Sequence, residues 1–127
     1  MPMLHRRAFR HAVDLGCSIV RERDFRLVAD RAVDLSTDGM LVDTHHRVLT
    51  GEPVIVSFRV PRSTRWVDAE AVVTRVVHGR RPGDQGRRLG LAFRGLDDET
   101  RHLIFQQLRA LPAASSRSAM RTRRADA

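Results

Sequence analysis

Basic side chains are concentrated at the start of the chain. The first twelve residues contain no acidic side chain and hold His5, Arg6, Arg7, Arg10 and His11. In an extended chain Arg6 and Arg10 project to the same side about 13 Å apart, because each residue advances about 3.3 Å. A guanidinium pairs bidentately with phosphate, so this spacing suits a ligand with two separated anionic groups. The alternative is a basic terminus that is merely solvated.

A second group of polar residues, Asp34, Ser36 and Gly39, lies between two apolar segments. Asp and Ser commonly bond backbone amides in turns, and Gly permits a positive φ or a close backbone approach, so the segment is predicted to be a turn. An ionised Asp34 is also a pure acceptor, which could take N–H hydrogen bonds from a flat base while Ser36 adds a hydroxyl. A structural turn and a base-binding turn both stay open on these residues alone.

The remaining polar residues do not indicate catalysis or metal binding. His45 and His46 are adjacent and diverge in a strand, and no Cys or His has the spacing of metal ligands, so no metal site is expected. Ser36 has no nucleophile elbow around it, and hydrolase chemistry is therefore not supported. We expect no enzymatic activity and no cofactor.

The net charge of +8 comes from 23 basic residues, all of them arginine, against 15 acidic ones. Arginine binds phosphates and guanine edges bidentately, so an anionic partner is expected, although a GC-rich genome would also favour arginine over lysine. The 127 residues suffice for one domain. Cys17 has no partner for a disulfide, and no signal peptide or apolar stretch of membrane-spanning length occurs, so we expect a cytoplasmic protein without a membrane span.

Six short segments show the alternation of half-buried strands, and they are joined by loops too short for crossover helices. They cover residues 13–19, 25–35, 40–42, 54–60, 66–77 and 89–93. The fifth segment alternates as far as Val73 and loses the pattern from Thr74 onward. Trp66 and the five phenylalanines mostly fall on strand positions and are expected in the core. The pattern favours an antiparallel β-barrel.

From Asp97 the apolar spacing becomes helical, with Asp97 as the expected N-cap and Pro112 as the stop. Residues 112–127 carry no large apolar side chain apart from one Met, so a disordered basic tail is expected. The predicted organisation is therefore an N-terminal basic arm (residues 1–12), a β-barrel with a C-terminal helix (13–111) and the tail. The fold class is all-β with a C-terminal helix.

The chain contains two short motifs whose order and spacing are informative. Arg-x-x-x-Arg spans residues 6–10 before the first strand, and Asp-x-Ser-x-x-Gly spans 34–39 between the second and third strands. Together they resemble the paired signature of the PilZ domain, a family that binds the bacterial second messenger cyclic di-GMP. The resemblance continues through Gly51-Glu52 and residues 71–76 and 89–93. It implies a six-stranded antiparallel β-barrel with a C-terminal helix, in agreement with the strand count.

The resemblance also implies ligand contacts. Arg6 and Arg10 would contact the phosphates and guanines of cyclic di-GMP, while Asp34, Ser36 and Gly39 would line the barrel surface beside a guanine. Guanine fits this set, since its O6 and N7 accept from an Arg fork and its N1–H and N2–H donate to a carboxylate.

Three further residues are weaker candidates for ligand contacts. Arg7 occupies a variable position of the first motif, and Arg75 lies on a strand that borders the ligand site in some family members. His5 precedes the first motif arginine, where the family varies and where the number of bound ligands can be influenced. One or two ligand molecules per site both remain open.

The sequence thus predicts a stand-alone, non-enzymatic receptor for cyclic di-GMP that orders its N-terminal arm on binding and signals to an unidentified partner protein. A first alternative is a basic β-barrel that binds nucleic acid. Such barrels stack bases on exposed aromatic rings, and the aromatic residues here are expected to face inward, so nucleic acid is not the expected partner. A second alternative is a PilZ-like interaction module without ligand, against which the intact motifs argue.

Overall fold

A computed structural model describes residues 10–78 and 86–111 of the chain. Several predicted features lie outside these residues. They are the candidate contacts His5, Arg6 and Arg7, the loop 79–85 and the tail 112–127.

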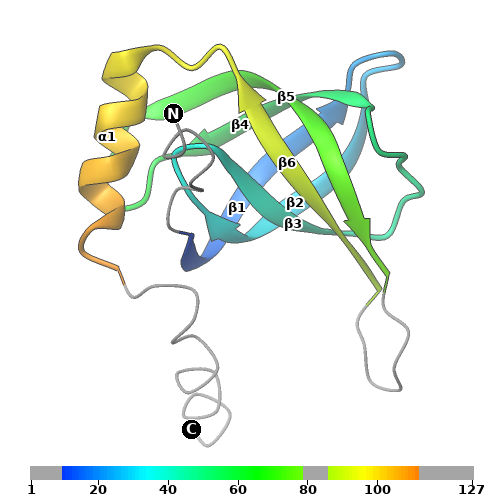
Figure 1. Ribbon diagram of the computed structural model, residues 1–127, viewed down its shortest axis with the longest axis horizontal. Coiled ribbons are helices and arrows are strands. Elements are labelled where there is room, and N and C mark those ends of the chain that lie inside the picture. Colours follow the sequence, from blue (N-terminus) through cyan, green and yellow to red (C-terminus); the bar gives the residue numbers. More distant parts are fainter. Residues whose placement is uncertain (1–9, 79–85, 112–127) are drawn as a thin grey trace, which may run out of the picture.

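Six strands and one helix make up the described fold. They are β1 (His11–Arg21), β2 (Arg26–Leu35), β3 (Gly39–Thr44), β4 (Pro53–Arg59), β5 (Trp66–Val77), β6 (Arg87–Arg94) and α1 (Asp98–Leu108). All strand pairs are antiparallel and the sheet closes in the order β1-β2-β3-β6-β5-β4 (Figure 1). The predicted six-stranded antiparallel β-barrel with a C-terminal helix is confirmed. β1 begins two residues earlier than predicted, since His11 and Ala12 already pair with β2.

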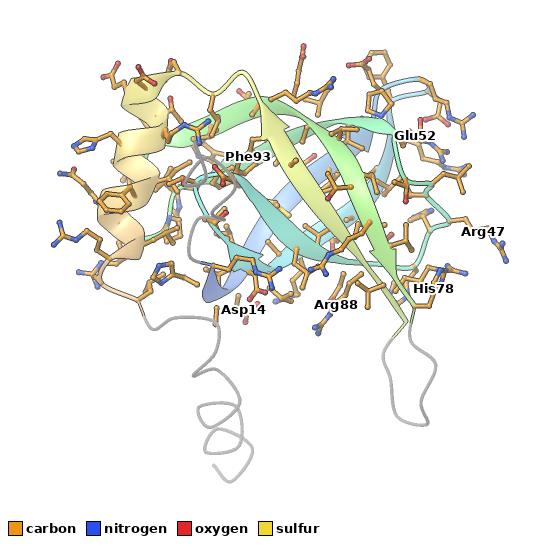
Figure 2. All side chains as sticks on the ribbon, in the orientation of Figure 1. Asp14, Arg47, Glu52, His78, Arg88 and Phe93 are labelled. Atoms are coloured by element: carbon orange, nitrogen blue, oxygen red, sulfur yellow. The ribbon has the colours of Figure 1, made fainter. Side chains whose placement is uncertain are left out.

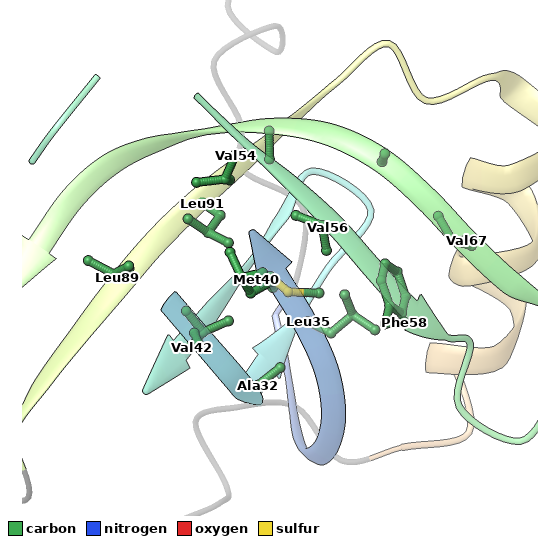
Figure 3. Packing of buried hydrophobic residues seen from close by; sticks show 14 of the residues in the cluster. Ala32, Leu35, Met40, Val42, Val54, Val56, Phe58, Val67, Leu89 and Leu91 are labelled. Atoms are coloured by element: carbon green, nitrogen blue, oxygen red, sulfur yellow. The ribbon is translucent and has the colours of Figure 1, made fainter. Parts of the chain in front are cut away.

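Apolar side chains fill the barrel, and charged side chains lie mainly on its outside, with Arg21 and Asp34 as the buried charged residues of the described part of the chain. Asp14, Arg47 and Arg88 point away from the strands (Figure 2). Inside, one continuous buried cluster includes Ala32, Leu35, Met40, Val42, Val54, Val56, Phe58, Val67, Leu89 and Leu91 (Figure 3). α1 lies against one end of the barrel, where its Ile104 and Leu108 join the same cluster (Figure 1).

The predicted alternation of the second strand is wrong at its beginning. Regular alternation over residues 25–35 places Phe25 and Leu27 on the core face, but these two residues are 73% and 49% exposed. Phe25 belongs to the β1–β2 turn and has a φ of 55°, so the strand alternation does not extend to it. The inward residues of β2 include Val28 and Ala32 instead.

The helix begins as the sequence predicts. The Asp97 side chain accepts a hydrogen bond from the Thr100 backbone N–H at 2.7 Å, which makes Asp97 the N-cap. Hydrogen bonds from Thr100 lower the pKa of the Asp97 carboxyl below its ordinary value. Asp98 and Glu99 occupy the first turn, where the helix dipole favours negative charge.

The expectation of buried aromatic residues holds for only part of the set. Phe58 is fully buried and stacks on Phe93, with ring centroids 6.0 Å apart. Trp66 is 62% exposed, and Phe25 and Phe105 are also exposed. Trp66 occupies an outward position of β5, where strand alternation turns its side chain to solvent regardless of its hydrophobicity.

Gly39, the first residue of β3, is pressed against β6. A Cβ at this position would lie 1.9 Å from the backbone carbonyl oxygen of Leu91, a distance that no side chain tolerates. The glycine is required for close backbone approach. Its cross-strand partner is Ala92 of β6.

We expect Gly39→Ala to lower the free energy of unfolding by about 1–3 kcal/mol, because the two backbones must separate to admit the methyl group. Urea denaturation monitored by circular dichroism measures the change. The matched control is Gly16→Ala in β1, where a Cβ meets no atom within 4 Å. That variant should be as stable as the parent, and equal losses in both variants would contradict the close approach.

Candidate functional site

The turn between β2 and β3 is organised by Ser36. Its hydroxyl oxygen accepts the backbone N–H groups of Asp38 and Gly39 at 3.0 and 3.2 Å. Its own backbone N–H donates to the Gly39 carbonyl at 2.9 Å. Ser36 is 4% exposed. The predicted turn is therefore observed, and its serine holds the loop in shape.

The helix α1 supports the same turn through Arg101. The Nη1 atom of Arg101 donates to the Thr37 carbonyl oxygen at 2.9 Å and to Asp38 Oδ1 at 3.1 Å. This role of Arg101 is not predictable from the sequence, because the contact joins residues more than sixty positions apart and depends on α1 lying against the barrel end. Arg101 lies outside both sequence motifs, so the motifs do not point to it.

A hollow of about 350 Å³ opens on the outer surface of the barrel beside this turn. Its lining residues are Arg10, Ser36, Asp38, Gly39, Met40, Leu41, Thr74, Arg75, Gly90, Leu91 and Ala92. We call it the motif hollow. It brings together Arg10 of the first predicted motif, Ser36 and Gly39 of the second, and the weaker candidate Arg75.

A β-bulge places Arg75 in the motif hollow. β5 pairs Val73 with Leu91 and Arg75 with Gly90, so Thr74 is an extra residue on one strand. Without the bulge Arg75 would follow Val73 into the core, since residues two apart share a face. Instead the Arg75 side chain lies across Gly90, where a Cβ would be 2.9 Å from its Cγ. The bulge explains why the apolar alternation stops at Thr74.

A second bulge orients Asp34. β2 pairs Ala32 with Val42 and Asp34 with Leu41, so one residue between them is extra, and Asp34 leaves the face that Ala32 shares with the core. Leu41 lines the motif hollow, and directly paired residues face the same side of a sheet. Asp34 therefore lies beside the hollow, although it is not part of its lining. Asp34 is only 2% exposed, so it is buried and not open to solvent.

The electrostatics of the motif hollow are dominated by arginine. Arg10 and Arg75 both line it, while the carboxylate of its one acidic lining residue, Asp38, is paired with Arg101. The walls also offer backbone groups and the Thr74 hydroxyl, which donates to the Gly90 carbonyl at 3.1 Å. A partly apolar hollow with two guanidinium groups suits an anionic ligand that carries a flat ring.

Metal and membrane features are absent from the part of the chain that the structure describes. Residues 10–78 and 86–111 contain no group of three His, Cys, Asp or Glu side chains that could hold a metal ion. In the same residues no helix has the length and apolar character needed to cross a membrane.

Solved structures with a similar fold include two PilZ domains. The Bacillus subtilis inhibitor of motility MotI/DgrA superposes with a TM-score of 0.66 and 20% identity, over 82% of this chain and 49% of that one. This chain thus spans about half the length of the MotI chain. The PilZ domain of Escherichia coli YcgR, solved with c-di-GMP, gives a TM-score of 0.66 and 16% identity, over 93% and 96% of the two chains.

The PilZ domain of CeSA from a cellulose-synthesizing bacterium is similar with a TM-score of 0.55 and 12% identity, over 78% of this chain and 93% of that one. No curated protein matches the chain. At these identities the structural likeness concerns the fold. The family model for the PilZ domain, however, matches residues 4–110, from before β1 to beyond the end of α1. The chain therefore belongs to the PilZ domain family.

Proposed function

We propose that this protein is a non-enzymatic receptor for cyclic di-GMP that binds the ligand in the motif hollow and signals to a partner protein. The observation that carries the proposal is the convergence of Arg10, Ser36, Gly39 and Arg75 on one hollow, although they come from three separate parts of the chain. The structural similarity to a PilZ domain solved with c-di-GMP supports the ligand class.

The chemistry of the site fits a guanine. An arginine fork can donate to O6 and N7 on one edge of guanine, and a carboxylate can accept from N1–H and N2–H on the adjacent edge, so Arg10 and Asp34 together match both edges of one base. Adenine would present an acceptor and a single amino group to the carboxylate. The volume of about 350 Å³ is within the usual range for small-molecule sites, roughly 300–1,000 Å³.

The second half of the ligand would lie outside the motif hollow, toward the N-terminal arm. Arg6 is proposed to bind the phosphates there, with Arg7 and His5 as further contacts. Because Arg10 immediately precedes β1, the arm starts at the rim of the hollow. Ligand that contacts both Asp34 and Arg6 would order the arm against the barrel, and the surface so created is the proposed signal.

The exposure of the aromatic residues bears on the nucleic-acid alternative, because the sequence predicted that they face inward. Trp66, Phe25 and Phe105 are exposed, so aromatic rings are in fact available for stacking. The groove beside Trp66, however, is lined by the carboxylates of Asp68, Glu70 and Asp97 against the guanidinium of Arg94, and this net negative charge repels a phosphate backbone. We therefore propose no nucleic-acid function.

Arg10→Ala should weaken the binding of cyclic di-GMP at least tenfold, because the variant loses a charge-assisted contact. Isothermal titration calorimetry measures the affinity and the stoichiometry together. The matched control is Arg59→Ala, which removes the same side chain from an exposed position on β4 outside the hollow. The control should bind within about twofold of the parent. Equal affinities for Arg10→Ala and the parent would remove Arg10 from the site.

Asp34→Asn should also weaken binding at least tenfold, since the amide presents a donor where guanine itself donates. Asn preserves the volume of the buried side chain, so the thermal midpoint should stay close to that of the parent. Asp30→Asn, on an exposed position of the same strand, is the control and should leave the affinity unchanged. A folded Asp34→Asn protein with parental affinity would show that Asp34 serves the turn and not the ligand.

Hydrogen exchange should reveal the ordering of the arm. Amides of residues 3–9 should exchange at least about tenfold more slowly with saturating cyclic di-GMP than without it. His11 and Ala12 are already strand residues paired with β2, and they serve as internal references that should change little. Identical protection of residues 3–9 with and without ligand would place the switch elsewhere.

A further inference from the structure

A second hollow, of about 550 Å³, lies where β5 begins and the chain leaves β6 for α1. We call it the Trp66 groove. Its lining residues are Trp66–Glu70, Arg94–Asp97 and Thr100. It shares no lining residue with the motif hollow. Nothing in the proposed function uses it.

The groove contains a free strand edge. β6 ends at Arg94, which pairs with Glu70, so residues 66–69 of β5 pair with β4 alone. The other edge of this four-residue stretch faces the groove, where the chain turns away toward α1 (Figure 1). An open edge presents backbone N–H and C=O groups to an added extended segment.

The side chains along this edge select for arginine. Trp66, Asp68 and Glu70 alternate on the outer face of β5, with steps of about 6.8 Å between successive side chains. The Trp66 indole is 62% exposed and can bind a guanidinium over its ring. Asp68 Oδ1 accepts from the Ser57 hydroxyl at 2.6 Å, whereas Glu70 has no side-chain hydrogen bond or ion pair within the described residues. An extended segment with arginines two residues apart would match both carboxylates.

We propose that the Trp66 groove binds the C-terminal segment of this same chain, residues 112–127, with Arg121 and Arg123 opposite Asp68 and Glu70. The segment carries four arginines against one aspartate. The groove lining carries Asp68, Glu70 and Asp97 against Arg94, the cross-strand partner of Glu70, so the groove is net negative and the two charges are complementary. In an extended segment Arg121 and Arg123 share a face and lie about 6.8 Å apart, which equals the spacing of the two carboxylates. The inference is independent of the proposed ligand.

The segment is long enough to reach the groove. It follows Leu111, whose carbonyl oxygen lies 3.1 Å from His11 Nδ1, at the end of α1 away from the groove. α1 has 11 residues and is therefore about 16 Å long. The ten residues from Leu111 to Arg121 can span up to about 33 Å when extended. Tethering raises the effective concentration of the segment, so individually weak ion pairs suffice for binding within one chain.

Trp66 is the single tryptophan and the chain has no tyrosine, so its fluorescence reports on the groove alone. In the full-length protein we compare acrylamide quenching of R121S/R123S with that of R117S/R124S. Both double variants remove two positive charges from the segment, but only the first removes the pair that faces the carboxylates. The quenching constant should rise about twofold or more in R121S/R123S and change little in R117S/R124S, and 0.5 M salt should remove the difference.

Charge reversal tests the pairing. D68R/E70R should show the same increase in quenching, and adding R121E/R123E to it should restore the parental value. If D68R/E70R fails to fold, D68N/E70Q replaces it and should show the increase alone. Equal quenching in all variants, or equal increases in the two double variants of the segment, would overturn the proposal. Shielding that grows with protein concentration would overturn it in favour of a segment from a second copy. Parental affinity of these variants for cyclic di-GMP keeps this outcome separate from that of the proposed function.

Discussion

The close contact between Gly39 and the backbone of β6 is the constraint on which the site depends. It lets β3 start directly against Leu91 and Ala92, with no side chain between the two strands. The Asp38 carbonyl also accepts the Phe93 N–H at 2.8 Å, so the turn is joined to β6 on both sides of the glycine. The same turn closes the barrel and forms a wall of the motif hollow. The shape of the hollow therefore cannot be separated from the packing of the barrel.

Two β-bulges, one in β2 and one in β5, set the orientation of two charged side chains of the site. Asp34 follows Ala32 by two residues, and Arg75 follows Val73 by two, so a regular strand would direct both charged side chains into the apolar core. Burying an unpaired charge there is costly. One extra residue in each strand turns the side chain away from the apolar core. Arg75 then lines the motif hollow, and Asp34, although buried, lies beside it. The bulges thus keep two charged side chains out of the core and place them at the site.

α1 contacts both hollows through neighbouring residues. Arg101 binds Thr37 and Asp38 in the turn beside the motif hollow, and Thr100 lines the Trp66 groove. The two hollows differ in chemistry, because two arginines against one aspartate line the first, whereas an indole and three carboxylates against one arginine line the second. The net charge of +8 does not predict the local charge of either hollow. Local arrangement, and not overall charge, decides which partner each surface fits.

The barrel, the helix and the turn could be predicted from the sequence, because each depends on local patterns. Strand alternation and short loops specify six antiparallel strands, Asp97 is an N-cap by its position before a helical period, and Ser36 is a turn residue by its type. The two motifs, through their order and spacing, also indicated the family that the family model confirms over residues 4–110. The contacts of Arg6, Arg7 and His5 stay predictions, since these residues lie outside the described part of the chain.

Which side chains face outward, and which surfaces they share, depends on contacts between segments that are distant in the sequence. A bulge changes the face of every later residue in a strand, and whether it forms depends on the partner strand, so the orientation of Asp34 and Arg75 could not be read from alternation. The exposure of Trp66 likewise follows from its outward register on β5, and not from its hydrophobicity. Arg101 reaches the turn because α1 lies against the barrel end. Contacts between distant residues depend on packing, which local sequence patterns do not encode.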